Sequence, residues 1–331
     1  MIVTAHPTAP RASGSVTIAI GTCNRLAVLR RCLGSLRGRI AAPSRIVVAD
    51  AGSTDGTIAY LEGLTDIELI RDGAPIGQAR SLNRVLQTAA TDYFCWLSDD
   101  NVVRGGMIDL AVEILDNHEG FGMVALKTKD VTGPHKQLPY IGGHWETGVI
   151  TCNQGVVRTE LLQRLGGFDE TLRDYGIDAD LTARVLLSGR TVAFTKAVAI
   201  DHERDHDRTA WIDSEGRRKR IAEARDLYRR KYDPLVALVR GAALFHHRER
   251  LKRLMMRCIN RAFRSAKLVG LSLERTTGWN TRDISNLLFS RYVSIHREIS
   301  CTGRPYHLVQ EMPARLRAAA LKAVSSHDLA S

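Results

Sequence analysis

The first two thirds of the chain alternate short apolar runs with longer stretches in which apolar residues recur every three or four positions. Short β-branched runs are typical of buried strands, and the longer spacing is typical of amphipathic helices. The expected strands are residues 16–20, 45–49, 67–70 and 93–97, and the expected helices are residues 25–36, 57–64 and 78–88. This alternation predicts an α/β fold with a mostly parallel sheet flanked by helices.

The pattern becomes mixed after residue 109. The elements expected there are a helix to about residue 117, a strand at 123–127, helices at 159–165 and 179–188, and a strand at 191–200. After Trp211 we expect helices almost exclusively. The predicted organisation is a flexible tail over residues 1–14, an α/β domain over 15–210 and a basic helical extension over 211–331.

Composition changes this picture little, because 44% hydrophobic and 25% charged residues are ordinary for a globular protein of 331 residues. Charge changes it more. The net charge of +11 is concentrated in residues 215–275, which hold 18 basic and 6 acidic side chains. Such a block suits nucleic acid, an anionic membrane surface or a phosphate-bearing substrate, and charge alone does not select one.

Within that block, residues 248–269 place apolar side chains at helical spacing and arginines mostly on other faces. This basic amphipathic helix either docks on the rest of the protein or attaches to an anionic membrane surface. No nucleic-acid reading motif is present, so no nucleic acid partner is expected. The six scattered cysteines and the absence of a signal-peptide pattern indicate a cytoplasmic protein, with peripheral attachment to the inner face of the cell membrane as an option.

Acidic residues follow two of the expected strands. Asp50 comes directly after residues 45–49, and Asp99 and Asp100 come shortly after residues 93–97. Ligands bind at the carboxyl ends of the strands in open α/β sheets. Asp50 is therefore a candidate for binding a base or ribose, although a tight turn with Asp55 as a helix N-cap explains the same pattern. Asp99 and Asp100 are equally compatible with a solvated turn.

Several segments occur together in one order. They are Thr22–Arg25, Asp50–Asp55, Gly77–Asn83, Trp96–Asn101, Gly166–Glu170 and Tyr175–Leu181. In this order and spacing, residues 15–210 resemble the family 2 glycosyltransferases of GT-A fold. The resemblance implies inverting transfer of a sugar from a nucleotide-diphosphate sugar to an acceptor hydroxyl, in the synthesis of cell-surface polysaccharide or glycolipid. A glycan, a lipid-linked glycan and a small molecule remain open as acceptors.

The resemblance also implies a metal site. Carboxylates beside a diphosphate require a divalent cation between them, so Asp100 is expected to bind Mg²⁺ or Mn²⁺, with His202 completing the site. Asp178 is expected to be the general base that deprotonates the acceptor hydroxyl, and its alternative role is a helix N-cap. The residues expected to bind the donor are Thr22, Asn24, Arg25, Asp50, Ser53, Arg80 and Asp99.

Two positions depart from the family pattern, because Ser98 and Ile177 stand where relatives usually carry acidic residues. They leave open a catalytically inactive nucleotide-sugar-binding protein. A more remote alternative is a zinc hydrolase, since His202-Glu203-Arg204-Asp205-His206 matches the spacing of a zinc-protease motif. That motif requires a helix with an apolar face, whereas this segment follows an expected strand and is flanked by charged residues.

Overall fold

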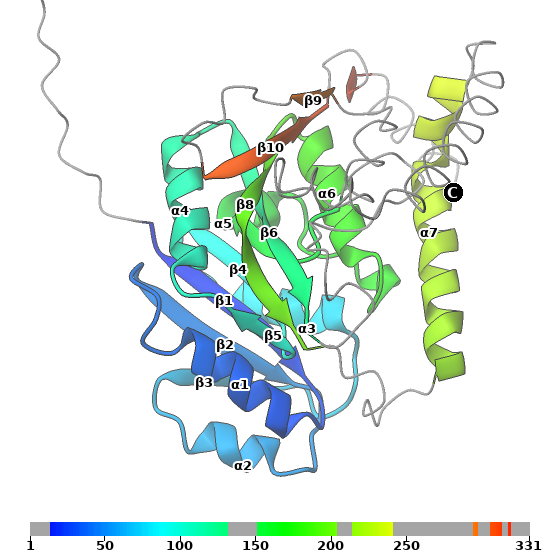
Figure 1. Cartoon of the computed structure of the whole chain (residues 1–331). Helices are drawn as coiled ribbons and strands as arrows, with labels where there is room; N and C mark the ends of the chain where they lie inside the picture. Colours follow the sequence, from blue (N-terminus) through cyan, green and yellow to red (C-terminus); the bar gives the residue numbers. More distant parts are fainter. Residues whose placement is uncertain are drawn as a thin grey trace, which may run out of the picture.

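The computed structural model describes residues 14–131, 151–203, 214–240, 294–296, 305–312 and 317–318. One twisted sheet forms the middle layer, and helices cover both of its faces (Figure 1). Its strands follow the order β3-β2-β1-β4-β7-β6-β8-β10-β9, with β5 paired to β8. The predicted α/β fold is therefore confirmed.

The first half of the sheet is parallel. It contains β1 (Val16–Thr22), β2 (Ser44–Asp50), β3 (Ile67–Arg71) and β4 (Tyr93–Ser98), connected by helices α1 (Leu26–Leu36), α2 (Thr57–Glu62) and α3 (Gln78–Gln87). In register, Thr22 pairs with Asp50, and Gly21 pairs with Ser98. The loops that follow β1, β2 and β4 therefore emerge at the same edge of the sheet.

The second half is mixed. It contains β5 (Asn101–Val103), β6 (Phe121–Asp130), β7 (Gly155–Arg158), β8 (Thr191–His202), β9 (Ser294–His296) and β10 (Tyr306–Glu311). Its helices are α4 (Met107–Asn117), α5 (Thr159–Arg164), the short 3₁₀ helix η1 (Glu170–Leu172), α6 (Ile177–Leu187) and α7 (Ser214–Arg240). The antiparallel pairing of β5 with β8 places Asn101 opposite His202, so the loop after β4 lies beside the end of β8.

The core has one layer on each face of the sheet. Alternate residues of a strand point to opposite faces, so Ile18 and Ile20 pack with α1 and α4, whereas Ala19 packs with α3 and α6. On the second face Phe168, at 1% exposure, makes an edge contact with Trp96 at a ring-centroid distance of 5.8 Å. The turn before η1 is thereby fixed against the sheet.

Some sequence-based expectations were wrong. Residues after Trp211 are not exclusively helical, because β9 and β10 extend the sheet through pairing with β8. Asp55 is not the N-cap of α2, a position that Gly56 occupies; its carboxylate instead accepts hydrogen bonds from the amide and hydroxyl of Thr57. Asp178 is likewise not the N-cap of α6, which is Gly176.

Two expectations fall outside the described residues: the tail over residues 1–13 and the basic helix over 248–269. Across the part of the chain that the structure describes, no helix has the length and apolar character needed to span a membrane.

We expect Phe168→Ala to lower the free energy of unfolding by about 3–5 kcal/mol, because it leaves a cavity between the sheet and the η1 turn. Chemical denaturation measures the effect. Val131→Ala is the control, since Val131 is 47% exposed and should stay within about 0.5 kcal/mol of the wild type. A Phe168→Ala variant as stable as the control would contradict the described packing.

Candidate functional site

A cavity of about 420 Å³ opens at the edge of the sheet where the loops after β1, β2 and β4 meet. It is lined by Gly21, Thr22, Cys23, Arg25, Ala51, Pro75, Gly77, Gln78, Ser81, Ser98, Asp99, Asp100, Asn153, Gln154, Arg173, Asp174, Tyr175, His202, Arg217 and Ile221. Among the predicted site residues, it brings together Thr22, Arg25, Asp99, Asp100 and His202.

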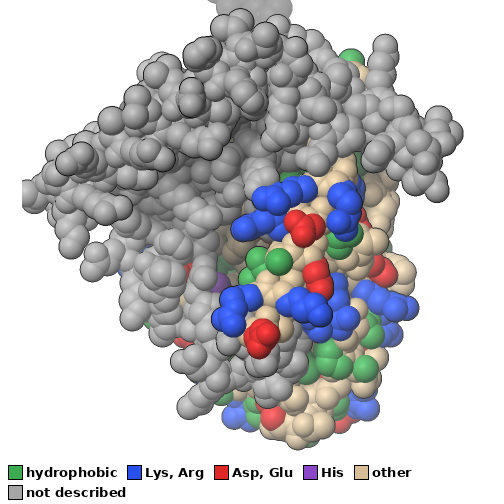
Figure 2. Space-filling model, turned by 90° about the vertical axis from the view of Figure 1, so that its right-hand side faces the viewer, with side chains coloured by type: hydrophobic (Ala, Val, Ile, Leu, Met, Phe, Trp, Pro, Cys, Tyr) green, Lys and Arg blue, Asp and Glu red, His purple; other side chains and the backbone are tan. Residues whose placement is uncertain are grey.

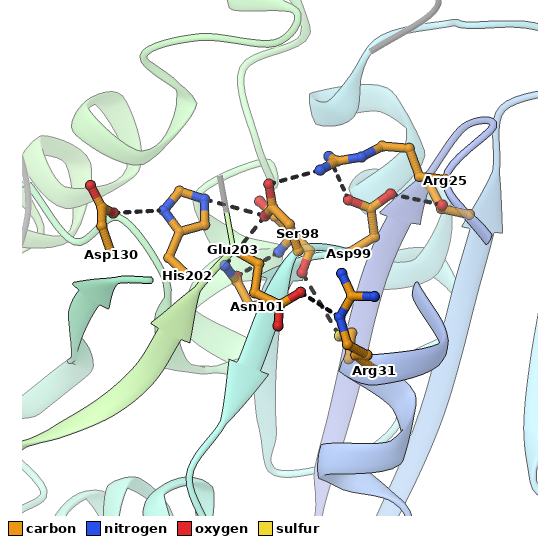
Figure 3. A network of polar contacts seen from close by, with 11 residues as sticks. Arg25, Arg31, Ser98, Asp99, Asn101, Asp130, His202 and Glu203 are labelled. Atoms are coloured by element: carbon orange, nitrogen blue, oxygen red, sulfur yellow. Dashed lines mark hydrogen bonds and ion pairs between the residues drawn. The ribbon is translucent and has the colours of Figure 1, made fainter. Parts of the chain in front are cut away.

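The carboxylate pair Asp99–Asp100 lies just beyond β4, with exposures of 3% and 9%. Thr22 Oγ1 donates to Asp99 Oδ2 at 2.8 Å. The Arg25 guanidinium spans both carboxylates, with Nη1 2.8 Å from Asp99 Oδ1 and Nη2 3.0 Å from Asp100 Oδ2 (Figure 3). Burial raises the pKa of Asp99, against the opposing effect of Arg25. Burial also acts on Asp100, but hydrogen bonds and charge from His202 and Arg25 hold its pKa below the ordinary value.

His202 is the last residue of β8 and lies between two carboxylates. Its Nε2 is 3.3 Å from Asp100 Oδ1, and its Nδ1 is 3.2 Å from Asp130 Oδ1 (Figure 3). Asp130 is the last residue of β6, is 1% exposed and pairs in register with His202. A carboxylate on the second ring nitrogen fixes the orientation of the imidazole. Asp130 therefore directs Nε2 of His202 toward Asp100.

These residues fit a two-ligand metal site. No group of three or more His, Cys, Asp or Glu side chains in the described ranges is arranged to hold a metal by itself. Asp100 and His202 nevertheless offer one carboxylate oxygen and one imidazole nitrogen, while Asp99 is held by Thr22 and Arg25. Carboxylate suits Mg²⁺ or Mn²⁺ and imidazole suits transition metals, so the chemistry of these two side chains is compatible with a divalent cation that takes its other ligands from elsewhere.

Asp50 is fully buried at the end of β2. Its Oδ1 accepts from the backbone amides of Gly52 at 3.0 Å and Ser53 at 2.8 Å. These two hydrogen bonds form the tight turn that was the alternative interpretation of this segment. Its Oδ2 is also buried but has no hydrogen-bond partner in the structure. An unsatisfied buried acceptor is costly, and a ligand that donates a hydrogen bond would satisfy it. Asp50 does not line the cavity itself, although the next residue, Ala51, does.

Asn24 and Ser53 join the loops after β1 and β2. The backbone amide of Asn24 donates to Ser53 Oγ at 2.8 Å, and the side-chain oxygen Oδ1 of Asn24 accepts from the backbone amide of Thr54 at 2.7 Å. Asn24 takes a left-handed backbone conformation with φ of 53°, which asparagine tolerates better than most residues. In the structure both side chains hold the loops, and neither lines the cavity.

Asp178 lies in the first turn of α6 and is partly accessible to solvent. Burial raises its pKa to about 6, while hydrogen bonds from the Ala179 amide and the Thr151 side chain lower it. Thr151 begins the segment whose Asn153 and Gln154 line the cavity. Asp178 is therefore next to the segment that supplies these lining residues, although it does not line the cavity itself.

Arg80 is not brought to the cavity. It lies on α3 with its side chain 62% exposed, and its nearest ion-pair partner is Glu170 at 3.9 Å. An exposed helical arginine was the alternative interpretation of this residue.

Sequence analysis assigned no site role to the residues of one wall of the cavity, although two of its motif segments include Gln78, Ser81 and Tyr175. This wall comes from the start of α3, from the turn before α6 and from α7, and it is formed by Gln78, Ser81, Arg173, Asp174, Tyr175, Arg217 and Ile221. The backbone amide of Gln78 donates to Asp174 Oδ1 at 3.1 Å, and the backbone amide of Ala79 donates to the Arg173 carbonyl at 2.8 Å. These contacts join elements far apart in sequence, and the sequence of neither segment indicates that the two are in contact.

Comparison with known proteins identifies the first part of the chain. Residues 17–148 match the model of a family described as "Glycosyl transferase family 2". This segment is a family 2 glycosyl transferase domain. Its presence supports glycosyltransferase activity. No curated protein matches the chain.

The chain has the α/β fold of GT-A glycosyltransferases, and S. aureus TarS is a structural neighbour. S. aureus TarS 1-349 in complex with UDP is 17% identical, with a TM-score of 0.50 over 78% of this chain and 75% of that chain. The mannosyltransferase PcManGT from Pyrobaculum calidifontis, in complex with GDP-Man and Mn²⁺, is 21% identical, with a TM-score of 0.46 over 63% of this chain and 62% of that chain.

Arg25→Met tests the charge balance of the site. At pH 8 we expect it to lower the free energy of unfolding by about 3–5 kcal/mol, because two buried carboxylates lose their shared cation. Arg104→Met is the control, since Arg104 pairs with Asp201 near the surface and should cost about 1 kcal/mol or less. Chemical denaturation of both variants gives the comparison, and equal losses would argue against a buried charge cluster.

Proposed function

We propose that this protein is an inverting, metal-dependent glycosyltransferase that moves a sugar from a nucleotide-diphosphate sugar to an acceptor hydroxyl. The observation that carries the proposal is the convergence of Asp99, Asp100 and His202 on the wall of a cavity at the carboxyl ends of β4 and β8. A carboxylate pair supports binding of a diphosphate only through a cation.

The donor's nucleotide would occupy the side of the cavity formed by the loops after β1 and β2. The unpartnered Oδ2 of Asp50 can only accept hydrogen bonds while ionised. It therefore favours a ribose hydroxyl or a base with a ring N–H, such as uracil or guanine. Asn24 and Ser53 support this side by holding the two loops together, and Thr22 by holding Asp99.

Asp100 and His202 would hold Mn²⁺ or Mg²⁺, and Asp130 would orient the imidazole. When bound, the ion neutralises the charge that develops on the departing diphosphate. Arg25, which contacts both carboxylates, is close enough to the same position to add a second positive charge. Arg80 points elsewhere and has no part in this proposal.

Asp178 would remove the proton from the acceptor hydroxyl as that oxygen attacks the sugar. The raised pKa of about 6 makes it a stronger base than an ordinary aspartate while it remains largely ionised at neutral pH. Ile177, where relatives usually carry an acid, is 4% exposed and packs in the core, so Asp178 is the carboxylate available at this point of the α6 first turn.

The acceptor would belong to cell-surface polysaccharide or glycolipid synthesis, and it would be a glycan, a lipid-linked glycan or a small molecule. Lys and Arg side chains gather on the face that carries α7 (Figure 2). The exposed basic residues of that helix include Arg218, Lys219, Arg225, Arg229 and Arg230. A surface of this kind suits an anionic membrane, where a lipid-linked acceptor resides.

The zinc-hydrolase alternative lacks its structural requirement. His202 ends a strand instead of lying on a helix, and Glu203, which would be the base, is paired with Arg31 at 2.5 Å. The other alternative is a nucleotide-sugar-binding protein without turnover. It predicts nucleotide binding but no sugar transfer in the wild type.

Calorimetry with UDP and GDP, with and without Mn²⁺, tests the donor site. We expect Mn²⁺ to strengthen binding of one nucleotide at least tenfold in the wild type, and Asp100→Asn to abolish that gain. Asp201→Asn is the matched control, because Asp201 is the neighbour of His202 but pairs with Arg104. Metal-independent binding, or no binding across the panel, would count against the proposal.

Asp178→Asn tests the base. We expect the kcat for transfer to fall by about 10²–10⁴-fold while nucleotide binding is retained. In the wild type, kcat should rise with pH, with a midpoint at pH about 6. Asp178 must lose its proton to act, and its pKa is raised to about 6. Glu160→Gln is the control for loss of a carboxylate, because Glu160 lies on α5 away from the cavity lining and its side chain is 80% exposed. Full turnover in Asp178→Asn would remove this residue from the mechanism.

A further inference from the structure

Helix α7 lies beside α6 and packs on the same core layer (Figure 1). Tyr228 and Tyr232 of α7 are each 1% exposed and belong to the core cluster that contains Ile177 and Leu181 of α6. Exposed basic residues occupy other parts of the surface of α7, on the face of the molecule that Figure 2 shows. α7 is thus an amphipathic helix whose apolar side faces the family 2 fold.

The contact between the two helices centres on one buried carboxylate. Asp180, in the first turn of α6, is fully buried. Its Oδ2 accepts from Nε of Arg184 at 2.7 Å, one turn later in the same helix. Its Oδ1 is 2.7 Å from the Tyr232 hydroxyl and 2.7 Å from Lys231 Nζ. A buried carboxylate is costly unless donors surround it, so α7 supplies two of the groups that make this burial possible.

Two further ion pairs attach α7 to the turn that precedes α6. Lys231 Nζ also lies 2.7 Å from Asp169 Oδ2, just before η1. Arg220 Nη1 lies 2.5 Å from Asp174 Oδ2. Arg173 lies between these two anchored residues and lines the cavity, as do Asp174 itself and the following Tyr175. α7 therefore holds both ends of a segment that shapes the site.

The opposite side of α6 is held by the segment that starts at Thr151. Asp178 and Thr182, one turn apart, share that side: Asp178 is hydrogen-bonded by Thr151, and Thr182 Oγ1 accepts from the Cys152 amide at 3.0 Å. Residues two apart in a helix lie about 200° apart around its axis. Asp180 therefore points to α7 while Asp178 points to the cavity wall, and the first turn of α6 is clamped between them.

We propose that Lys231 and Tyr232 are positioning residues for Asp178. By binding Asp180 they fix the first turn of α6, and with it the distance of the Asp178 carboxylate from the cavity. The inference rests on the role proposed above for Asp178. Neither α7 residue lines the cavity, whereas Asp99 and Asp100, in the turn after β4, and His202, at the end of β8, all do. We call these contacts of Lys231 and Tyr232 with Asp180 the clamp. Loss of the clamp should lower the rate of turnover more than it weakens donor binding.

The experiment compares Lys231→Met and Tyr232→Phe with Glu223→Met. The control removes an exposed charge from the same helix, outside its basic surface. For the variants at Lys231 and Tyr232 we expect kcat to fall 10–100-fold with donor KM within about twofold, because small displacements of a catalytic group are costly. Amide hydrogen exchange of residues 177–182 should become faster in these variants and stay unchanged in Glu223→Met. Lys231→Arg, which keeps the charge, should recover part of the turnover.

Several outcomes would overturn the inference. Unchanged exchange at 177–182 would show that α7 does not hold this turn, and faster exchange with unchanged kcat would show that holding it does not position the base. A uniform rise in exchange with higher donor KM would indicate a general loss of stability. If the wild type transfers no sugar, the proposed function fails by itself, and unaltered exchange in the clamp variants would then refute the clamp separately.

Discussion

The site depends on burying two adjacent carboxylates at the end of a strand. Asp99 and Asp100 repel each other, and removal from water penalises both charges. The fold compensates them with Arg25 from the loop after β1, with the Thr22 hydroxyl and with His202 from the end of β8. Three elements distant in sequence must therefore converge on one point. Much of the sheet topology can be understood from this requirement.

The strand order brings these groups together. β1 lies beside β4 in the parallel half, so Thr22 and Arg25 emerge next to the carboxylate pair. His202 reaches it from the mixed half because the short β5, which follows Asp100 directly, pairs with the end of β8. β6 runs parallel to β8 and ends at Asp130, which contacts the far side of the imidazole. The same pairings that complete the sheet therefore set the geometry of the charges.

The sequence predicted the parallel half well because its signals are local: apolar strands, amphipathic helices and acidic residues at strand ends. It missed β5 and β7, which have three and four residues and include Asn101 and Gly155, too short for a periodic pattern. It also missed Asp130, because nothing near that residue shows that its partner lies 72 positions away. The prediction that Arg80 binds the donor came from its place in a motif, which does not specify the exposed side of α3.

The expected boundary at residue 210 assigns α7 to an extension. Side chains of α7 nevertheless compensate a buried carboxylate that lies before this boundary. Asp180 is as deeply buried as Asp99, and it is compensated in a similar way, by cations and a hydroxyl. Arg184 of α6 supplies one cation, and α7 supplies the other cation and the hydroxyl, whereas the groups that compensate Asp99 come from the end of β1 and the loop after it. A buried carboxylate that needs donors from α7 makes the start of α6 incomplete without that helix. The end of the α/β fold around α6 and the helix α7 therefore stabilise each other around the residue proposed to take the proton.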